Sequence, residues 1–313
     1  MKKLLLVCLW LLLCQGAATA LEVGIVGGPN PQLWPVFIGN KYNMFGAAGQ
    51  LDLLTAPSSA GVVQQVAAGS LPMSVSSGLP DPIRAAAMGA DVALVRIDGT
   101  VSPYALLARP TIHGLADLRG KIISIGGAKD ITRVYLQRML APSGINPTEY
   151  DLVFAGATSA RFAALTAGAV DAAILFPPFN FRAVGAGYRE LGLVVDFAPE
   201  LPFSGLTANR AWARANPALL QAVLDGYGHA VAWMHDPAHR DEAIDMMVTA
   251  THSSVQDITQ TFDFLGRIGF YAEQGTIPRH KVAAMIDALV AQGDIPVGTT
   301  VEQVVLPGVS VAP

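Results

Sequence analysis

The sequence predicts an α/β fold of two lobes, each built on a mainly parallel sheet flanked by helices, with two crossings of the chain between the lobes. Three observations predict it. Short apolar runs ended by glycine, serine or proline alternate with stretches whose apolar residues recur at three and four spacing, which is typical of βαβ units. The same series of runs occurs twice along the chain. The 313 residues, 52% of them hydrophobic, are enough for two ordinary cores.

The first series predicts three strands, over residues 23–26, 51–54 and 73–75. A helix between the second and third strands is predicted by apolar residues at helical spacing: Val62, Val63 and Val66. Its N-cap is expected at Ser58 or Ser59, because serine accepts hydrogen bonds from the free N–H groups of a first helical turn. Gly69 is expected to end it, because glycine adopts the left-handed conformation common after a last helical turn.

The second series predicts strands over residues 122–125, 152–154 and 172–175 and helices over 131–140 and 158–167, the latter closed by Gly168. It overlays on the first series with a constant offset of 99 residues and no gap. We interpret the match as two structurally similar lobes; the alternative is a coincidental register between two βαβαβ stretches. The overlay places Gly27 and Gly28 on Gly126 and Gly127, Asp52 on Asp151, Ser59 on Thr158, and Gly69 on Gly168.

After the second series, a strand over 190–195 and an extended segment over 202–208 precede helices over 217–235, 240–249, 255–265 and 278–291. These helices follow no strands of their own, so we expect them to pack on the first lobe or on each other. The chain then crosses near 102–109 and returns near 194–205. The predicted domains are a first lobe of residues 21–103 plus 203–313 and a second lobe of residues 104–202.

The N-terminal segment resembles a secretory signal peptide, over residues 1–20. Lys2 and Lys3 precede an apolar run over 4–13, and Ala18-Thr19-Ala20 is a small-x-small cleavage signal. Export to the periplasm with cleavage near Ala20 is therefore expected. Both cysteines, Cys8 and Cys14, lie in this segment, which excludes a disulfide framework from the exported chain. Leu11 to Leu13 before Cys14 disfavour a lipid anchor, which needs small residues there.

Charge and motifs exclude several function classes. Removal of Lys2 and Lys3 takes the formal net charge from −4 to −6 with no basic stripe, so we expect no nucleic-acid partner. His235 and His239 are four apart, but Pro237 between them and the lack of a third ligand favour a solvated helix end over a metal site. Dinucleotide, P-loop and nucleophile-elbow motifs are missing from the sequence. We therefore predict no catalytic residues, no metal and no cofactor.

Two motifs carry a family resemblance. Leu115-Ala-Asp-Leu-Arg-Gly-Lys121 leads into a predicted strand, and Ala164-Leu-Thr-Ala-Gly-Ala-Val-Asp-Ala172 follows some 45 residues later. Val66-Ala-Ala-Gly69, followed by a strand and the turn Ser76-Ser77-Gly78, matches the corresponding element of the first lobe. With these motifs the sequence resembles the solute-binding proteins of bacterial importers for sulfonates, taurine, nitrate and thiamine-pyrimidine precursors. Tyr42, Phe45 and Gly46 match that family's first helix only loosely, which leaves the subfamily open.

The resemblance implies a periplasmic-binding-protein clamshell of the type II-like, two-crossing kind. It also implies a small-molecule ligand between the lobes, an ABC permease in the inner membrane as partner, and a monomeric chain.

The expected binding site follows from the geometry of open parallel sheets, in which ligands bind beyond the carboxyl ends of the strands, near helix N-termini. Each lobe supplies three such turns, at 28–34, 57–59 and 76–78 and at 127–132, 156–158 and 176–178. The glycines and hydroxyls of these turns could instead serve only turns and caps, and Trp34, next to Pro35, could belong to the core. The residues predicted to contact a ligand are Asn30, Gln32, Trp34, Ser58, Ser59, Ser76, Ser77, Gly78, Gly127, Ala128, Thr132, Thr158, Phe176 and Pro177.

The basic groups near these turns are Lys129, Arg96 and Arg133, each either a partner for an anionic ligand or a solvated surface residue. N–H donors and hydroxyls favour a sulfonate-like or other organic anion, whereas Trp34 and Phe176 would suit an aromatic or pyrimidine-like ligand. Transport is the leading functional hypothesis. A periplasmic sensor for a signalling receptor and an enzyme of thiamine-pyrimidine or menaquinone type are the alternatives, the enzyme disfavoured by the export signal and by turns without histidine or cysteine.

Overall fold

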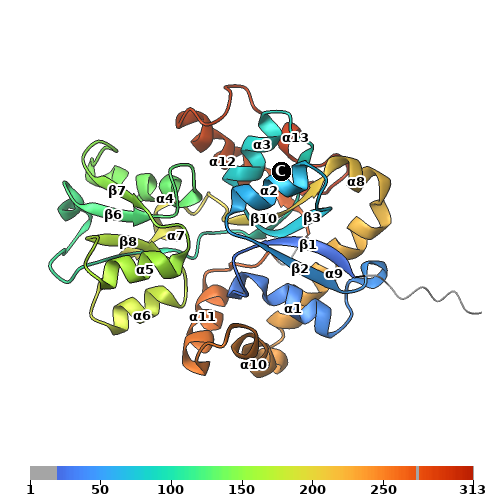
Figure 1. Cartoon of the computed structure of the whole chain (residues 1–313), viewed down its shortest axis with the longest axis horizontal. Helices are drawn as coiled ribbons and strands as arrows, with labels where there is room; N and C mark the ends of the chain where they lie inside the picture. The colour runs from blue at the N-terminus through green and yellow to red at the C-terminus, as the bar shows by residue number, and fades with distance from the viewer. Residues whose placement is uncertain (1–19, 273–274, 313) are drawn as a thin grey trace, which may run out of the picture.

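The computed structural model describes residues 20–272 and 275–312. The chain forms two lobes that lie side by side, each around a five-stranded sheet (Figure 1). The expected signal peptide lies outside the described residues, apart from Ala20 at its end. Within the described ranges, no helix combines the length and the apolar character needed to cross a bilayer.

The sheet of lobe one has the strand order β2-β1-β3-β10-β4. Its strands are β1 (Leu21–Val26), β2 (Leu51–Ala56), β3 (Met73–Gly78), β4 (Val92–Gly99) and β10 (Ser204–Asn209). The sheet of lobe two has the order β7-β6-β8-β5-β9. Its strands are β5 (Ala105–Ala108), β6 (Ile122–Ile125), β7 (Asp151–Phe154), β8 (Ala172–Leu175) and β9 (Arg189–Leu193). Each lobe thus places its second strand at one edge, its first and third strands next, and then a strand of reversed direction.

Both sheets are mainly parallel in strand direction, as predicted, but each contains one reversed strand that the sequence did not reveal. β1 pairs in parallel with β2 and β3, and β6 pairs in parallel with β7 and β8. β10 is antiparallel to β3 and β4, and β5 is antiparallel to β8 and β9. The reversal has a simple cause: β5 and β10 are formed where the chain has just crossed from the other lobe, so they run away from the hinge while their neighbours run toward it.

The predicted helices of the two βα series form with close to their expected bounds, and they follow the strands at the carboxyl edges of the sheets. The side chain of Ser58 caps the first of them by accepting a hydrogen bond from the Gly61 N–H at 3.1 Å. Gly69 and Gly168 each follow a helix with φ of +75° and +73°, a conformation that glycine adopts without strain. The predicted helices are α2 (Ser59–Ala67), α4 (Ile131–Leu140) and α5 (Thr158–Thr166). The structure adds α3 (Pro80–Ala87) and α6 (Phe179–Gly185), which were not predicted.

The two βα series correspond to each other in the structure, except that the first strand is shifted by one residue relative to the predicted overlay. α2 and α5 begin and end 99 residues apart. In the sheets, however, Glu22 pairs with Asp52 and Ile122 pairs with Asp151, so the first strands are 100 residues apart while the second strands are 99 apart. The gapless overlay is therefore wrong by one residue at the first strand, and Gly27 corresponds to Gly127 rather than to Gly126.

The C-terminal helices pack mainly on lobe one, as the sequence predicts. They are α9 (Pro217–His235), α10 (Arg240–Thr251), α11 (Val255–Arg267), α12 (Arg279–Ala291) and the short α13 (Val301–Val304). The first helix, α1 (Trp34–Lys41), lies against α9 and α10, while α12 and α13 lie against α3. A two-stranded sheet of β11 (Ile277–Pro278) and β12 (Val311–Ala312) was not predicted.

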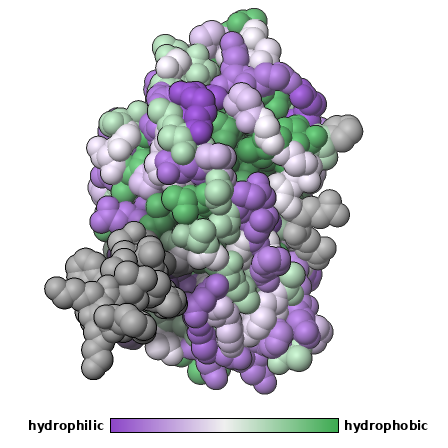
Figure 2. Space-filling view, turned by 90° about the vertical axis from the view of Figure 1, so that its right-hand side faces the viewer, coloured by the Kyte–Doolittle hydropathy of each residue, from purple (hydrophilic) through white to green (hydrophobic). Residues whose placement is uncertain are grey.

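Short elements complete the described chain. Large apolar side chains are buried mainly between the sheets and their helices. On the face of lobe one turned away from lobe two, hydrophilic and hydrophobic residues are interspersed (Figure 2). The short elements are α7 (Val194–Phe197), α8 (Arg210–Ala215) and the 3-10 turns η1 (Pro31–Leu33), η2 (Gly46–Ala48), η3 (Leu115–Leu118), η4 (Ala141–Ser143) and η5 (Pro237–His239).

The chain passes between the lobes twice. The first passage lies between the end of β4 at Gly99 and the start of β5 at Ala105, and the second lies between the end of β9 at Leu193 and the start of β10 at Ser204. β4 is the neighbour of β10 in one sheet and β5 the neighbour of β9 in the other, so the two passages lie close together. They form a hinge that sets the carboxyl edges of the two sheets facing each other (Figure 1).

Candidate ligand-binding cleft

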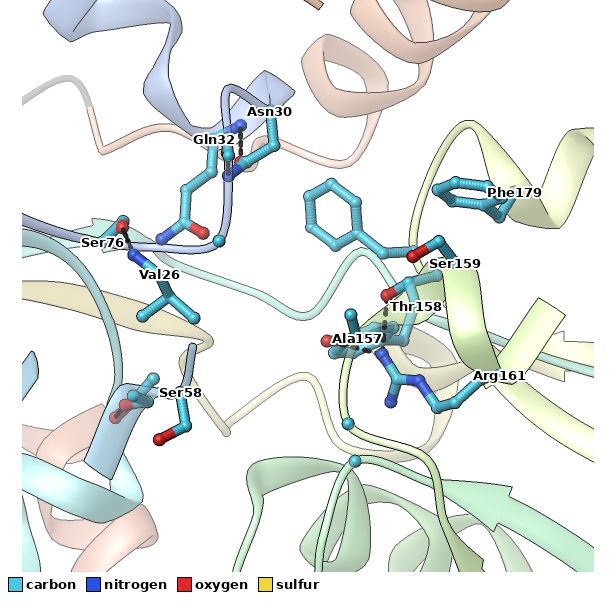
Figure 3. A pocket seen from close by; sticks show the side chains of 18 of the residues that line it. Val26, Asn30, Gln32, Ser58, Ser76, Ala157, Thr158, Ser159, Arg161 and Phe179 are labelled. Carbon is cyan, nitrogen blue, oxygen red and sulfur yellow. Dashed lines mark hydrogen bonds between the residues drawn. The ribbon is translucent and has the colours of Figure 1, made fainter. Parts of the chain in front are cut away.

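A cavity of about 620 Å³ lies between the lobes, and residues from all six predicted strand-end turns line it. Its volume falls in the range of sites for small organic ligands. Figure 3 shows residues of lobe one on one side and residues of lobe two, from the start of α5, on the other.

The lobe-one wall is made by the loop after β1, the start of α2 and the end of β3. Asn30 caps η1 by accepting a hydrogen bond from the Gln32 N–H at 3.0 Å, and its amide nitrogen donates to the Gly28 carbonyl at 3.1 Å. The Ser76 hydroxyl accepts a hydrogen bond from the Val26 N–H at 3.3 Å. These bonds fix the loop after β1 against β3, so its polar groups are held at the cavity rather than free to move away.

Gln32 connects this wall to a buried acid. Its Nε2 donates to Oδ2 of Asp98 at 3.3 Å, and the other carboxyl oxygen accepts from the Gly99 N–H at 2.8 Å. Asp98 is fully buried, and its burial raises the pKa of the carboxyl above the ordinary value. In Figure 3 the oxygen of the Gln32 amide faces the cavity and its nitrogen faces away.

The lobe-two wall centres on the N-terminus of α5, whose cap differs from the serine cap of α2. The N-cap is Ala157, which has no side chain able to accept, and Thr158 is the first residue of the helix. The Thr158 hydroxyl accepts a hydrogen bond from Nη2 of Arg161 at 2.6 Å (Figure 3). The first N–H groups of α5 are therefore left for other partners at the edge of the cavity.

Arg161 is a buried cavity residue that sequence reasoning missed. Its side chain lines the cavity and is 2% exposed. Nη2 also donates to the Tyr104 hydroxyl at 3.3 Å, and the guanidinium lies 5.2 Å from the centre of the Tyr104 ring. Nε and Nη1 have no hydrogen-bond partner, and within the described residues no carboxylate pairs with this cation. A buried charge without a counterion is costly, so this position favours an anion strongly.

Three aromatic rings line the cavity near the hinge. Tyr104 lies in the first crossing, Phe203 in the second, and Phe176 follows β8. The ring centre of Tyr104 is 5.7 Å from that of Phe176 and 5.5 Å from that of Phe203, both with edge-to-face geometry. Burial raises the pKa of the Tyr104 phenol, so its hydroxyl stays protonated at neutral pH. The cation of Arg161 is thus held against rigid groups that belong to the hinge itself.

The structure brings ten of the fourteen predicted residues to the cavity. Of the three basic residues considered from the sequence, Lys129 lines the cavity, Arg96 is buried over the Tyr227 ring, and Arg133 bonds to the Ala128 carbonyl outside it. The ten predicted residues at the cavity are Asn30, Gln32, Ser58, Ser59, Ser76, Gly78, Gly127, Thr158, Phe176 and Pro177.

Four predicted residues do not line the cavity: Trp34, Ser77, Ala128 and Thr132. Trp34 is completely buried, its Nε1 donates to the Ala243 carbonyl at 2.6 Å, and its ring packs edge-to-face on Phe262. It starts α1, which turns the ring toward α10 and α11 instead of the cleft.

Local contacts explain why the other three residues, Ser77, Thr132 and Ala128, do not line the cavity. Ser77 is fully buried, and its hydroxyl bonds to that of Ser74 at 2.5 Å, where the pairing of β3 with β10 shifts its register. Thr132 is fully buried, and its hydroxyl accepts from the Gly126 N–H at 2.9 Å and bonds to Asp130. Ala128 lies in the same turn, with its carbonyl used by Arg133.

Other cavity residues were not predicted, among them Asp81, Phe179, Arg182 and Ser253. Arg182 pairs with Asp257 at 2.8 Å, and Asp81 pairs with Arg84 at 3.0 Å, so both charges already have partners. In the described part of the chain, no group of three histidine, cysteine or acidic residues is arranged to hold a metal ion.

The chain is similar to known proteins in sequence and in fold. A family model described as NMT1/THI5 like matches residues 30–243. The nitrate/nitrite binding protein NrtA from Synechococcus elongatus is 29% identical over 164 residues, which are 48% of this chain and 35% of that protein. The chain therefore matches about a third of the length of this curated relative.

Two solved structures define the similarity of the fold. The periplasmic aliphatic sulphonate binding protein SsuA from Escherichia coli superposes with a TM-score of 0.75 at 20% identity, over 94% of each chain. The desulfurization enzyme DSZB superposes with a TM-score of 0.64 at 16% identity, over 92% of this chain and 96% of that one. The fold is therefore the two-lobed one predicted from the sequence, and both a named binding protein and a named enzyme share it.

Proposed function

Because the chain belongs to the NMT1/THI5-like family, we propose that it is the periplasmic solute-binding component of an ABC importer and that it binds a small organic anion between its lobes. The names of its relatives support this proposal, since NrtA is a nitrate/nitrite binding protein and SsuA a periplasmic sulphonate binding protein. The family expected from the sequence motifs is confirmed.

The observation that carries the proposal is the buried, unpaired guanidinium of Arg161. A cation in a cavity of low dielectric favours a bound anion strongly, because both charges escape the screening of bulk water. Nε and Nη1 have no partner among the described residues, and the first N–H groups of α5 lie on the same turn of the chain. A sulfonate or carboxylate carries several oxygens, so an arginine and a helix N-terminus can bind it together.

We propose that the remaining ligand contacts come from the ten predicted residues that line the cavity, with Tyr104, Phe203 and Arg161 added. Phe176, Phe203 and Tyr104 would cover an apolar part of the ligand. The two lobes that close on it would be residues 21–103 plus 203–313 and residues 104–202. Residues 1–20 would direct export as a signal peptide, and an ABC permease in the inner membrane would receive the ligand from a monomeric chain.

Binding is favoured over catalysis by the residues of the cavity. Its described lining contains no histidine, and the described residues contain no cysteine. The similarity to DSZB shows that this fold can host an enzyme, but the described lining offers no histidine or cysteine to act as a general base or a nucleophile. A sensor would bind the same ligand in the same cleft and would differ only in the protein that recognises the closed form.

The proposal is tested by ligand-dependent thermal unfolding and calorimetry of the chain from Leu21 onward. The panel contains alkyl and aryl sulfonates, nitrate, carboxylates and pyrimidines. A ligand at about 100 times its Kd stabilises the folded state by about 2.7 kcal/mol and raises Tm by several degrees. We expect organic anions to produce this shift and uncharged pyrimidines to produce none.

The variant that links binding to the site is Arg161→Met, which keeps an apolar side chain in place of the cation. We expect Kd for the anion to rise about 100-fold or more, because loss of one partner from a buried charge pair costs about 3–5 kcal/mol. Arg133→Met is the matched control, since Arg133 lies on α4 outside the cavity. Equal affinities for the two variants would refute the proposed site, and a panel without any anionic binder would refute the proposed function.

A further inference from the structure

The amide of Gln32 is held in one orientation. Nε2 donates to Asp98, and no hydrogen bond among the described residues uses Oε1. The side chain is 7% exposed and lines the cavity, and Figure 3 shows Oε1 turned toward it. At this point Gln32 therefore presents a hydrogen-bond acceptor, and not a donor, to the cavity.

Asp98 enforces this orientation because both of its carboxyl oxygens act as acceptors. The Gly99 N–H donates to Oδ1, and Nε2 of Gln32 donates to Oδ2. Burial raises the pKa of this carboxyl, and the charge of Arg96, buried nearby, acts in the opposite direction by favouring the anionic form. If the Gln32 amide were reversed, its oxygen would face a carboxyl oxygen, which is a repulsive contact.

The charges on the two walls of the cavity also favour a ligand with an anion at one end and a hydrogen-bond donor at the other. The basic side chains that line the cavity, Lys129, Arg161 and Arg182, all come from lobe two. The described lining of lobe one has no basic side chain and contributes the carboxyl of Asp81, which pairs with Arg84. Lobe two contributes one carboxyl, that of Asp130, which accepts from the Thr132 N–H, and its cations Lys129 and Arg161 have no carboxylate partner among the described residues. One end of the cavity is therefore suited to an anion and the other to a group that donates hydrogen bonds.

We propose that Gln32 determines specificity, with Asp98 as its positioning residue, and that it selects anions that carry a hydrogen-bond donor at the end opposite their charge. The inference rests on the proposed function and adds the chemistry of the second end of the ligand. A ligand with an ammonium or hydroxyl group satisfies Oε1, whereas a ligand with a methyl group leaves it buried and unpaired, which costs affinity.

Ligands of matched shape test the proposal. We would measure Kd by calorimetry for 2-aminoethanesulfonate and 2-hydroxyethanesulfonate against propane-1-sulfonate, and for the carboxylate counterparts of each. We expect the Kd of each donor-bearing ligand to be about ten times lower, or lower still, than the Kd of its methyl-ended counterpart. In Gln32→Met, which has a similar shape without the acceptor, this ratio should fall to about one. Gln221→Met on α9, outside the cavity, should keep the wild-type ratio.

Asp98→Asn separates positioning from packing. The new carboxamide can donate to Oε1 of Gln32, which lets the Gln32 amide turn and present its NH₂ to the ligand. The preference for donors should then disappear or reverse. A circular dichroism spectrum like that of the wild type would show that the fold is retained, and an unchanged preference in the folded variant would refute the positioning role. If Asp98→Asn fails to fold, the comparison of Gln32→Met with Gln221→Met still tests whether Gln32 sets the preference for donor-bearing ligands.

Two outcomes separate the specificity proposal from the proposed function. If methyl-ended and donor-bearing anions bind equally well, or if Gln32→Met keeps the preference, the specificity proposal is wrong while the anion site stands. If no sulfonate or carboxylate of either kind binds, the proposed function fails and this inference fails with it.

Discussion

Arg161 is a charged residue in a place that disfavours charge. It lies on the first turn of α5, where its side chain folds back to donate to the Thr158 hydroxyl. Burial removes the guanidinium from water, and the two hydroxyls that it contacts replace only part of the lost hydration. Arg161 therefore destabilises the ligand-free protein, and a bound anion offsets this cost by pairing with the guanidinium.

The first prediction concerns the stability of the ligand-free protein. Because the cation of Arg161 is buried without a counterion among the described residues, Arg161→Met should raise the Tm of the ligand-free chain while it weakens anion binding. Replacement of a buried charge by an apolar side chain can stabilise by about 1–4 kcal/mol, which is a Tm shift of a few degrees. Differential scanning calorimetry without ligand measures it, and a lower Tm would show that Arg161 serves the fold rather than the ligand.

A second prediction concerns Trp34, which the structure places in the core. Trp34→Phe removes the hydrogen bond to the Ala243 carbonyl and part of the packing on Phe262. We expect a loss of about 1–3 kcal/mol in the free energy of unfolding and an unchanged Kd. Urea unfolding measures the free energy of unfolding, and calorimetry measures Kd. A Kd raised tenfold with unchanged stability would show that Trp34 contributes to the ligand site.

Sequence reasoning found the turns of the cleft but not its buried cation. The helix that carries Arg161 and the turn at its start could both be predicted from local patterns. The burial of this arginine could not, because it depends on Tyr104, which the chain brings from the hinge 57 residues earlier. A basic residue on the first turn of a cleft helix is the signal that could have found it.

At the scale of elements, local signals were sufficient for the first three strands of each series and for α2, α4 and α5, but not for β4, β5, α3 or α6. Ser58 caps α2, and Gly69 and Gly168 follow their helices, as the residue types predict. The direction of β5 and β10 could not be predicted, because it depends on which lobe the chain has just left. The same limit applies to the shift of one residue in the first strand, which becomes visible only in the pairing of the strands.

A third prediction concerns η3, which is part of the motif that carries the family resemblance. Asp117 accepts hydrogen bonds from the N–H groups of His113 and Gly114 at 2.8 and 3.2 Å, and these bonds lower the pKa of its carboxyl. An acid with a lowered pKa in the folded state stabilises above its unfolded pKa, about 3.9, and loses this effect as the pH falls through the folded value.

Asp117→Ala should therefore lower Tm by about 2 °C at neutral pH, and the difference from the wild type should shrink as the pH falls below the unfolded pKa and through the lower folded one. Asp117→Asn keeps one acceptor oxygen and should recover part of the loss at neutral pH. Thermal unfolding followed by circular dichroism across this pH range measures both variants, and a difference independent of pH would contradict the role of the charge.

At the scale of the whole molecule, the lobes touch on both sides of the cleft. On one side Nε2 of Gln292, which follows α12, donates to Oε1 of Gln137 on α4 at 2.8 Å, and Arg84 donates to the Lys129 carbonyl at 3.2 Å. On the other side Arg182 on α6 pairs with Asp257 on α11 at 2.8 Å. These contacts exist only when the lobes are close together, so they stabilise the closed form relative to an open one.

The last prediction follows from this geometry. Gln137→Ala removes a contact between the lobes without touching the cavity, so it should lower the population of the closed form and raise the apparent Kd about three- to tenfold, in proportion to that population. The loss should affect all ligands equally, because the residue contacts none of them, and it should show mainly as faster dissociation. Gln221→Ala, which loses a hydrogen bond within α9, is the matched control and should leave Kd unchanged. Stopped-flow and calorimetric measurements separate the two variants, and a change in the ratio of affinities between ligands would mean that Gln137 acts on the site and not on the closure of the lobes.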